Sequence, residues 1–453
     1  MTSEANNATA YPAHIEELVS RYALALGDCQ LDAVVIPAGE PQSIFMDDQQ
    51  LPFKPNPYLL QWGPLDEHPG SALIYRRDAG AEWLVHRPED FWHQVPDVPE
   101  LIQGGPLRVT AVSSTDEIGA RVAQLPPRKA LLGPLGGAAA NWDAGEPNPA
   151  GLVAAINEAR TRKTSWEIDN LRQASAVGVA GHQAAEECFL QGGSEYDIHQ
   201  AFRAACRTTD AEMPYPAIVA CNSHAATLHY QRLERAAGSG VSLLIDAGAA
   251  HNGYASDITR TYSEGAEFGA LIEAMHEVQR ALCESAQPGV DYRELHRAAH
   301  YGIAGLLHDA DLLTLDAASA ARSGIIRYFF PHGLGHFLGL QVHDVGALYQ
   351  RHVPPDDSPP GIDQHLRLTR VLEPGNVLTI EPGLYFIDSL LAELRATPLG
   401  EHVDWQRVDQ LRPYGGIRIE DNIYVTERGN ENLTRQAFAD AEAGEHEAQQ
   451  SAP

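Results

Sequence analysis

Two aspartates stand where a predicted β-hairpin could present them to a metal ion. An apolar strand over residues 241–245 runs into Asp246, and Asn252-Gly253 is a strong two-residue turn signal before a second strand over residues 253–262. If the chain turns there, Asp246 faces Thr259. Asp246 and Asp257 are then diagonal neighbours on one face of the hairpin, about 7–8 Å apart at the backbone.

Carboxylates at that separation can lean toward one point and hold two cations about 3.5–4 Å apart. The simpler interpretation of either aspartate is a side chain that caps a turn. Two acids on one sheet face favour the metal interpretation, because like charges there repel each other unless a cation lies between them.

Two further strands end in or contain an acid. The sequence Val-Leu-Thr-Ile over residues 377–380 leads directly into Glu381, and Pro382-Gly383 closes that strand. Residues 416–425 form another predicted strand, with Arg418 and Glu420 on the same side. Taken alone, Arg418 and Glu420 are also consistent with an ordinary ion pair on a sheet.

Three histidines lie within twelve positions among glycines: His332, His336 and His343. The helical zinc pattern of two histidines four residues apart does not apply to His332 and His336, because Gly-Leu-Gly separates them. A solitary histidine of this kind is usually structural, but glycines that allow close approach of the backbone favour a site.

Together these residues supply carboxylates and imidazoles and no thiolate. This donor set suits hard or borderline divalent ions, Mn²⁺ first and Co²⁺ second. Four carboxylates in one cavity would need about two such ions to offset their charge. The residues alone therefore indicate a dinuclear metal hydrolase.

The elements that position these residues belong to the second of two predicted domains. Residues 1–160 contain a helix from residue 14, short strands near residues 33–36, 71–75 and 83–86, and loops rich in proline. Thr164 and Glu167 form a capping-box pattern that opens a long helix to about residue 190. We therefore expect domains over residues 1–160 and 161–436, followed by a frayed acidic tail over residues 437–453.

Five motifs, IDAGA, SDITRT, HGLGHFLG, TIEPGLYF and GIRIEDN, occur in this order. They resemble the metal-ligand motifs of the creatinase/methionine-aminopeptidase ("pita-bread") superfamily. The segments FMDDQQLPFKPNPYLLQW and DFWHQVP resemble the N-terminal domain of bacterial Xaa-Pro dipeptidases, the prolidases of the PepQ type, which have organophosphorus acid anhydrolases as relatives. The resemblance implies an α+β protein, with an N-terminal mixed α/β creatinase-like domain followed by a C-terminal pita-bread catalytic domain.

The resemblance also implies the ligand roles. Asp246 would chelate one metal ion, Asp257 and Glu420 would bridge both, and His336 with Glu381 would hold the second. A hydroxide that bridges the ions would attack the scissile carbonyl, and Glu381 would accept and later donate the proton.

Further residues match positions around the substrate in the family. His332 and His343 are expected to act in catalysis with Glu381, and Arg418 to orient the ligand carboxylates from behind. The expected substrate-binding residues are His224, Tyr215, Arg367, which would grip the carboxylate of a dipeptide, and Trp92, which would reach the pocket of a neighbouring subunit.

The implied activity is hydrolysis of Xaa-Pro dipeptides by a cytoplasmic homodimer, with two Mn²⁺ or Co²⁺ ions per subunit. Phosphotriester hydrolysis is an expected side activity. Two alternatives are an aminopeptidase P-like enzyme, which takes longer Xaa-Pro peptides, and a pita-bread module that only binds. The presence of all five ligands speaks against the second.

Composition narrows the partners. The 453 residues include 61 acidic and 32 basic side chains, for a formal net charge of −29. No basic patch stands out that would neutralise nucleic-acid phosphates. No run of 18 apolar residues could span a membrane, and the first ten residues lack the layout of a secretory signal. We therefore expect neither nucleic acid nor membrane as a partner, whereas the resemblance implies a small dipeptide.

Overall fold

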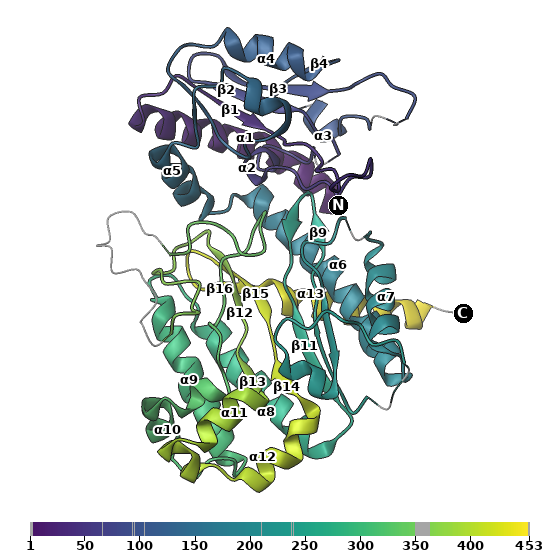
Figure 1. Cartoon of the computed structure of the whole chain (residues 1–453), viewed down its shortest axis with the longest axis vertical. Coiled ribbons are helices and arrows are strands. Elements are labelled where there is room, and N and C mark those ends of the chain that lie inside the picture. The colour runs from purple at the N-terminus through teal and green to yellow at the C-terminus, as the bar shows by residue number, and fades with distance from the viewer. Residues whose placement is uncertain are drawn as a thin grey trace. The chain divides into compact units, whose positions relative to one another are not determined.

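The computed structural model describes residues 3–451 except positions 66, 93, 95, 104, 210, 237, 239 and 349–362. Two positions of the DFWHQVP motif and the last two residues of the predicted tail therefore lie outside the described part. The chain forms two compact units, residues 1–170 and residues 171–453 (Figure 1). No helix among the described residues is both long and apolar enough to cross a membrane.

The first unit is built around one mixed six-stranded sheet in the order β4-β3-β2-β1-β5-β6. Its strands are β1 Ala33–Pro37, β2 Ala72–Arg76, β3 Gly80–His86, β4 Arg108–Val112, β5 Lys129–Leu131 and β6 Glu146–Pro147. Its helices are α1 Ser3–Asp28, α2 Pro57–Leu60, α3 Glu100–Gln103, α4 Thr115–Ala123 and α5 Ala150–Arg160. The three strands expected from sequence are β1, β2 and β3.

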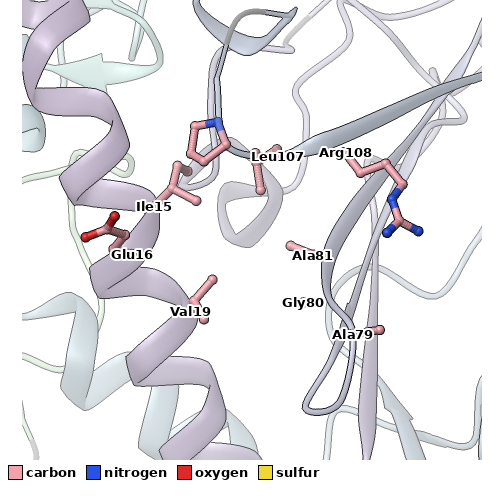
Figure 2. Close-up of a pocket in the computed structure, with 9 residues that line it drawn as sticks. Ile15, Glu16, Val19, Ala79, Gly80, Ala81, Leu107 and Arg108 are labelled. Carbon is pink, nitrogen blue, oxygen red and sulfur yellow. The ribbon is translucent and has the colours of Figure 1, made fainter.

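An open groove of about 500 Å³ lies between α1 and the strands of this sheet (Figure 2). Ile15 and Val19 of α1 face Ala81 and Leu107 across it. The groove has few polar groups, which are Glu16 and Arg108 at its margins, so it does not present a set of residues for hydrolysis.

The second unit carries short sheets surrounded by helices (Figure 1). Its strands are β7 Ile218–Cys221, β8 Ser242–Asp246, β9 Ala250–His251, β10 Tyr254–Ala255, β11 Thr259–Ser263, β12 Val377–Ile380, β13 Gly383–Tyr385, β14 Gly416–Arg418, β15 Asp421–Val425 and β16 Asn430–Asn432. Its helices are α6 Ser165–Leu190, which begins before the unit boundary, α7 Glu195–Cys206, α8 Ala266–Ser285, α9 Tyr292–Asp309, α10 Ala317–Ser323, α11 Asp388–Arg395, α12 Trp405–Leu411 and α13 Leu433–Ser451.

Two three-stranded sheets, β11-β8-β7 and β12-β15-β16, provide the frame of the site. They meet at one isolated bridge, where Thr259 pairs with Glu420. The segment before β12 also runs beside that strand, because Leu338 and Thr379 exchange backbone bonds with Val377 and His336. Both sheets and this segment therefore converge on the same point.

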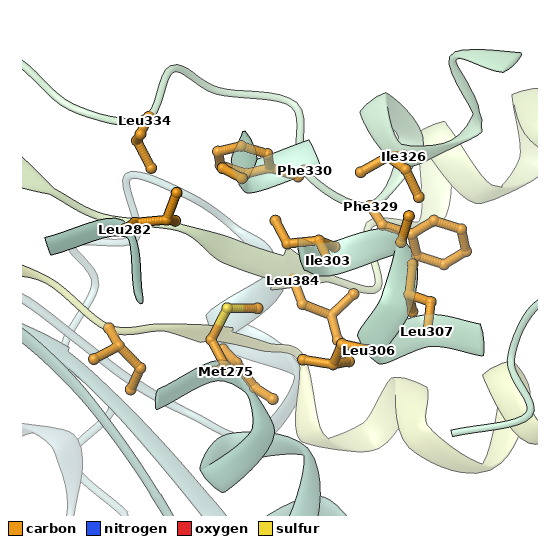
Figure 3. Close-up of a cluster of buried hydrophobic side chains, with 14 of the residues drawn as sticks. Met275, Leu282, Ile303, Leu306, Leu307, Ile326, Phe329, Phe330, Leu334 and Leu384 are labelled. Carbon is orange, nitrogen blue, oxygen red and sulfur yellow. The ribbon is translucent and has the colours of Figure 1, made fainter. Parts of the chain in front are cut away.

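An apolar core packs helices α8 and α9 against β12, β13 and β14 (Figure 3). Met275 of α8, Ile303 of α9 and Leu384 of β13 are buried in it. Burying such side chains contributes about 1.5–3 kcal/mol each before conformational entropy is counted. This core holds the strands that carry the polar residues in fixed positions.

Local patterns in the sequence account for two of the elements. The Thr164–Glu167 capping box forms, with the Thr164 amide donating to Glu167 Oε2 at 2.8 Å. The Asn252-Gly253 turn also forms: both residues have positive φ, 50° and 84°, as the predicted hairpin turn requires. These two predictions are confirmed.

Three elements differ from the expectations. The strand expected over residues 253–262 is interrupted between β10 and β11, and the strand expected over residues 416–425 is divided into β14 and β15. For residues 416–425, the reason is that the two halves pair with different strands. β14 pairs with β13, whereas β15 pairs with β12 and β16.

The tail expected to fray is instead part of helix α13, which runs to Ser451. Two contacts fix its first turns. Arg435 donates to Asp421 Oδ2 at 2.8 Å, and the Phe438 ring lies 4.8 Å from the guanidinium of Arg260. The alanine, glutamate and glutamine residues that suggested a tail are also good helix formers.

Candidate metal centre

Asp246 and Asp257 come together on the hairpin. Asp246 ends β8 opposite Thr259, as the predicted register requires, and Asp257 lies in the break between β10 and β11. The Tyr215 hydroxyl lies 2.9 Å from Asp246 Oδ1 and 2.5 Å from Asp257 Oδ1. Since a hydroxyl has one proton, Tyr215 can neutralise only part of the repulsion between these two carboxylates.

His336 and Glu381 enter from the segment beside β12. A Cβ atom at Gly335 would lie 2.2 Å from the carbonyl oxygen of Thr379, so only glycine allows this approach. His336 Nε2 lies 3.3 Å from Asp257 Oδ2 and 3.6 Å from Glu381 Oε1. His336 Nδ1 donates to the carbonyl of Phe337 at 2.9 Å. In the neutral ring the lone pair is therefore on Nε2 and is directed at the carboxylates, as in a metal ligand.

Glu420 completes the cluster at the junction of the two sheets. Its Oε2 accepts a 2.6 Å bond from the Thr259 hydroxyl, and its amide donates to the Thr259 carbonyl. Ligand atoms of Asp257, His336 and Glu420 all lie within 4.8 Å of one another. The break between β14 and β15 brings Glu420 to this point.

The buried carboxylates of the cluster would be stabilised by bound cations. Burial, together with the charges of Asp257 and Glu381, raises the pKa of Glu420 well above its usual range. Burial raises the pKa of Glu381 to about 7, although His336 and Arg418 oppose this shift. Among the protein groups alone, these carboxylates are thus hard to ionise together. Their oxygens and the Nε2 lone pair of His336 form the donor set that divalent ions prefer.

A hydrogen-bonded chain runs behind the carboxylates. Arg418 donates through Nη2 to Asp246 Oδ2 at 2.6 Å and through Nη1 to the Tyr385 hydroxyl at 2.8 Å. The Tyr385 hydroxyl lies 2.8 Å from His332 Nε2. Because His332 Nδ1 donates to the Gly333 carbonyl, Nε2 of the neutral ring accepts from Tyr385. Burial and the charge of Arg418 lower the pKa of His332 to about 3, which keeps the ring neutral.

His343 and Arg367 lie together at the exposed side of the cluster. The His343 ring packs edge-on against His336, with centroids 4.4 Å apart. Arg367 Nη1 donates to His343 Nδ1 at 3.1 Å. Burial, with the charges of His336 and Arg367, lowers the pKa of His343 to about 4. The neutral ring therefore carries its proton on Nε2 and can donate it to a ligand.

Two predicted substrate-binding residues have other surroundings. His224 donates from Nδ1 to the buried Glu195 at 2.7 Å and stacks on Tyr230. Trp92 belongs to the first unit, where its side chain is 76% exposed and contacts Phe91. The roles of His224 and Trp92 in substrate binding stay predictions.

Sequence reasoning assigned no role to three residues that the structure places at the site. Tyr385 links His332 to Arg418, and Thr259 fixes Glu420. His229 interacts electrostatically with both His332 and His343. Tyr385 and Thr259 stand inside motifs that were recognised, so their polar types were the available signal.

Comparisons with known proteins agree with this geometry. Residues 169–427 match metallopeptidase family M24, and residues 9–157 match the N-terminal domain of Xaa-Pro dipeptidase. The chain belongs to metallopeptidase family M24. Membership in this family and the cluster at Asp257, His336 and Glu420 together support the use of divalent metal.

Two similar proteins align over nearly the whole chain. The Xaa-Pro dipeptidase of Pseudoalteromonas atlantica is 42% identical over 438 residues, which are 94% of this chain and 98% of that protein. The Xaa-Pro dipeptidase of Shewanella loihica is 43% identical over 436 residues, covering 95% and 98%. The structure of aminopeptidase P from Escherichia coli with the inhibitor Pro-Leu is similar, with 25% identity, a TM-score of 0.69 and coverage of 92% of this chain and 94% of that one. The α+β fold with a C-terminal pita-bread domain is thereby established.

Proposed function

We propose that this protein hydrolyses Xaa-Pro dipeptides with proline at the C-terminus. The observation that carries the proposal is the combination, in one chain, of the carboxylate-rich metal centre and an N-terminal part that matches Xaa-Pro dipeptidase. The relatives that align over nearly the whole chain are named Xaa-Pro dipeptidase.

The protein groups divide the work of hydrolysis. Asp246, Asp257, His336, Glu381 and Glu420 would hold two divalent cations, Mn²⁺ first and Co²⁺ second. When bound, these ions supply Lewis acidity, which polarises the scissile carbonyl and makes water a stronger acid. Glu381, with a pKa raised to about 7 by burial, is suited to accept a proton from water and pass it to the leaving amine.

Hydrogen-bond donors near the cluster would stabilise the developing charge. His343 offers Nε2–H toward the site, since its Nδ1 accepts from Arg367. Tyr385 and Arg418 fix His332 and Asp246, so these side chains would need little rearrangement during the reaction.

The exposed guanidinium of Arg367 would bind the carboxylate of the substrate. The carboxylate of a dipeptide lies one residue after the scissile bond. A cation that binds this carboxylate therefore selects for short substrates. The proline nitrogen in an Xaa-Pro bond carries no N–H. The site would therefore need no acceptor for that hydrogen.

We further propose a cytoplasmic homodimer in which Trp92 of one subunit reaches the pocket of the other. Light scattering gives the mass of the assembly, and Trp92→Ala should raise KM for the dipeptide. A monomeric active enzyme would contradict this part of the proposal.

A substrate panel tests the activity. Metal-depleted protein is incubated with Gly-Pro, Ala-Pro and Ala-Pro-Ala, with and without Mn²⁺. We expect cleavage of both dipeptides only with metal, and little cleavage of the tripeptide. Preferential cleavage of Ala-Pro-Ala would instead support an aminopeptidase P-like activity, which the structural similarity to the Escherichia coli enzyme keeps as the second candidate.

Phosphotriester hydrolysis is proposed as a side activity, because the same polarising site can act on phosphorus as on carbon. The test is release of p-nitrophenol from a p-nitrophenyl phosphotriester by the Mn²⁺-loaded protein. We expect slow turnover that Asp257→Asn abolishes; turnover that survives this substitution would not come from the metal centre.

A further inference from the structure

We propose that His296, His300 and Asp363 form an additional metal site, which binds one zinc-type divalent cation per chain. The three side chains lie outside the candidate metal centre. They constitute the other group of potential ligands found among the described residues, with one ligand atom of each within 4.8 Å of the others.

The two histidines have the spacing of a helical metal site. They are four residues apart on α9 and therefore point from one face of the helix. Their Nε2 atoms are 3.3 Å apart. Two nitrogen ligands at about 2.0–2.1 Å from a tetrahedral zinc ion are separated by about 3.4 Å. The observed separation thus fits two ligands of one ion.

Asp363 supplies the third ligand from a distant part of the chain. Its Oδ1 lies 3.5 Å from His296 Nε2. One proton shared between the two rings would satisfy only one of the two Nε2 lone pairs. The other Nε2 and the Asp363 carboxylate would then still lack a common partner. A cation could accept both lone pairs and the carboxylate at the same time.

Burial makes this arrangement specific. His296 and His300 are 3% and 5% exposed, and Asp363 is largely buried. Buried imidazoles and a carboxylate lose hydration, which a bound ion can replace. Burial lowers the pKa of His300 to about 3, so its ring is neutral at pH 7, as a metal ligand must be.

The surroundings favour zinc over calcium or magnesium. Arg327 donates to Asp363 Oδ1 through Nε at 3.0 Å and Nη2 at 2.8 Å, which orients the carboxylate and offsets its charge. The attraction for the ion then comes mainly from two imidazole nitrogens, which suit Zn²⁺ and not the hard ions that prefer oxygen.

The Phe330 ring contacts both this site and His332 beside the candidate metal centre (Figure 3 shows Phe330 in the adjoining core). Its centroid is 5.8 Å from His296 and 5.4 Å from His300, and it also contacts His332, at 4.8 Å. The two sites would therefore bind their ions through separate ligands, with one aromatic ring in contact with both sites.

A cation here would join α9 to the segment that carries Arg367. Asp363 precedes Arg367 by four residues, and Val371 further along pairs with Asp291 at the start of α9. The ion would thus act as a cross-link that fixes Arg367 without touching the substrate.

Metal content tests the site. The full-length protein is stripped with a chelator, loaded with Zn²⁺, dialysed and analysed by inductively coupled plasma mass spectrometry. We expect three zinc ions per chain for the wild type and two for His300→Asn. His308→Asn is the matched control, because His308 lies exposed on the same helix, and it should keep three. Equal zinc contents in the wild type and in His300→Asn would overturn the proposal, whatever number of ions the candidate metal centre holds.

A second variant covers the case in which His300→Asn does not fold. Asp363→Asn has nearly the same shape and should weaken binding of the third zinc ion by at least tenfold in a competitive titration with a chelating dye. Unchanged binding would overturn the proposal. Neither measurement depends on peptide hydrolysis, so both stay decisive if the proposed activity fails.

Discussion

The two clusters of metal-ligating side chains are built differently, although both are buried in the same unit. The candidate metal centre takes its ligands from separate strands and loops and contains four carboxylates. The His296 cluster takes two imidazoles from one helix and one carboxylate, which is already paired with Arg327. The first concentrates negative charge, whereas the second is close to neutral.

This difference separates reactive from structural chemistry. Excess negative charge would hold two cations, and burial, with a smaller contribution from Asp257 and Asp246, raises the pKa of Glu381 to about 7, where a proton can be exchanged. A neutral cluster with a charge-paired carboxylate has no comparable group, so an ion bound there would only connect segments.

The largest effect should come from removing one charge at the metal centre. Asp257→Asn should lower kcat/KM for Ala-Pro by about 10³-fold, or about 4 kcal/mol of transition-state stabilisation, because one carboxylate that would hold the cations is lost. Circular dichroism should show that the fold is retained. The exposed Asp309→Asn is the control and should leave kcat/KM unchanged. Full activity of Asp257→Asn would remove this residue from the ligand set.

In the metal-free protein, the buried carboxylates should make the free energy of unfolding depend on pH. The folded state keeps a proton on Glu381 up to about pH 7, whereas the unfolded state releases it near 4.5. The free energy of unfolding should therefore fall by about 3 kcal/mol as the pH rises from 4.5 to 7. Urea denaturation at a series of pH values measures this change.

Glu381→Gln should flatten that pH dependence in the metal-free protein, and the exposed Glu393→Gln should leave it as in the wild type. Stability that rises with pH over the same interval in the wild type would contradict the account of uncompensated buried carboxylates.

A smaller effect is expected from the chain behind the carboxylates. Arg418→Lys should lower kcat for Ala-Pro by about 10- to 100-fold, because a single ammonium cannot bond both Asp246 and Tyr385 in this geometry. Arg412→Lys, on the exposed surface, should have no effect. Equal kcat values for the two variants would show that the chain does not position the ligands.

The smallest effect belongs to the His296 cluster. Asp363→Asn should leave kcat unchanged and raise KM for Ala-Pro by about two- to fivefold, or up to about 1 kcal/mol, because only the placement of Arg367 changes. Steady-state kinetics with Zn²⁺ present measures both constants. A fall in kcat as large as that of Asp257→Asn would erase the distinction between the clusters.

Local signals explain why the hairpin was predictable. The Asn252-Gly253 turn fixes the register, and alternation along β8 and β11 then places Asp246 opposite Thr259. Likewise, the Thr164 capping box depends on residues three positions apart. Such features are encoded by neighbours in the chain, so no tertiary information is needed.

Tertiary pairing decided the features that the sequence did not reveal. The division of residues 416–425 into β14 and β15 depends on partners more than thirty residues away. His296 and His300 stand four residues apart in the sequence. Asp363, which completes the group of potential metal ligands, comes from a remote segment. Side-chain links such as Tyr385 to His332 also require the folded geometry.

The central claim is that two cations at the carboxylate-rich centre carry out the hydrolysis. The most direct test is to titrate metal-depleted protein with Mn²⁺ while following the release of proline from Ala-Pro. We predict that activity is absent without metal, rises to a maximum at two equivalents per chain, and does not change at a third. Full activity in metal-depleted protein, or a maximum at one equivalent, would contradict the account.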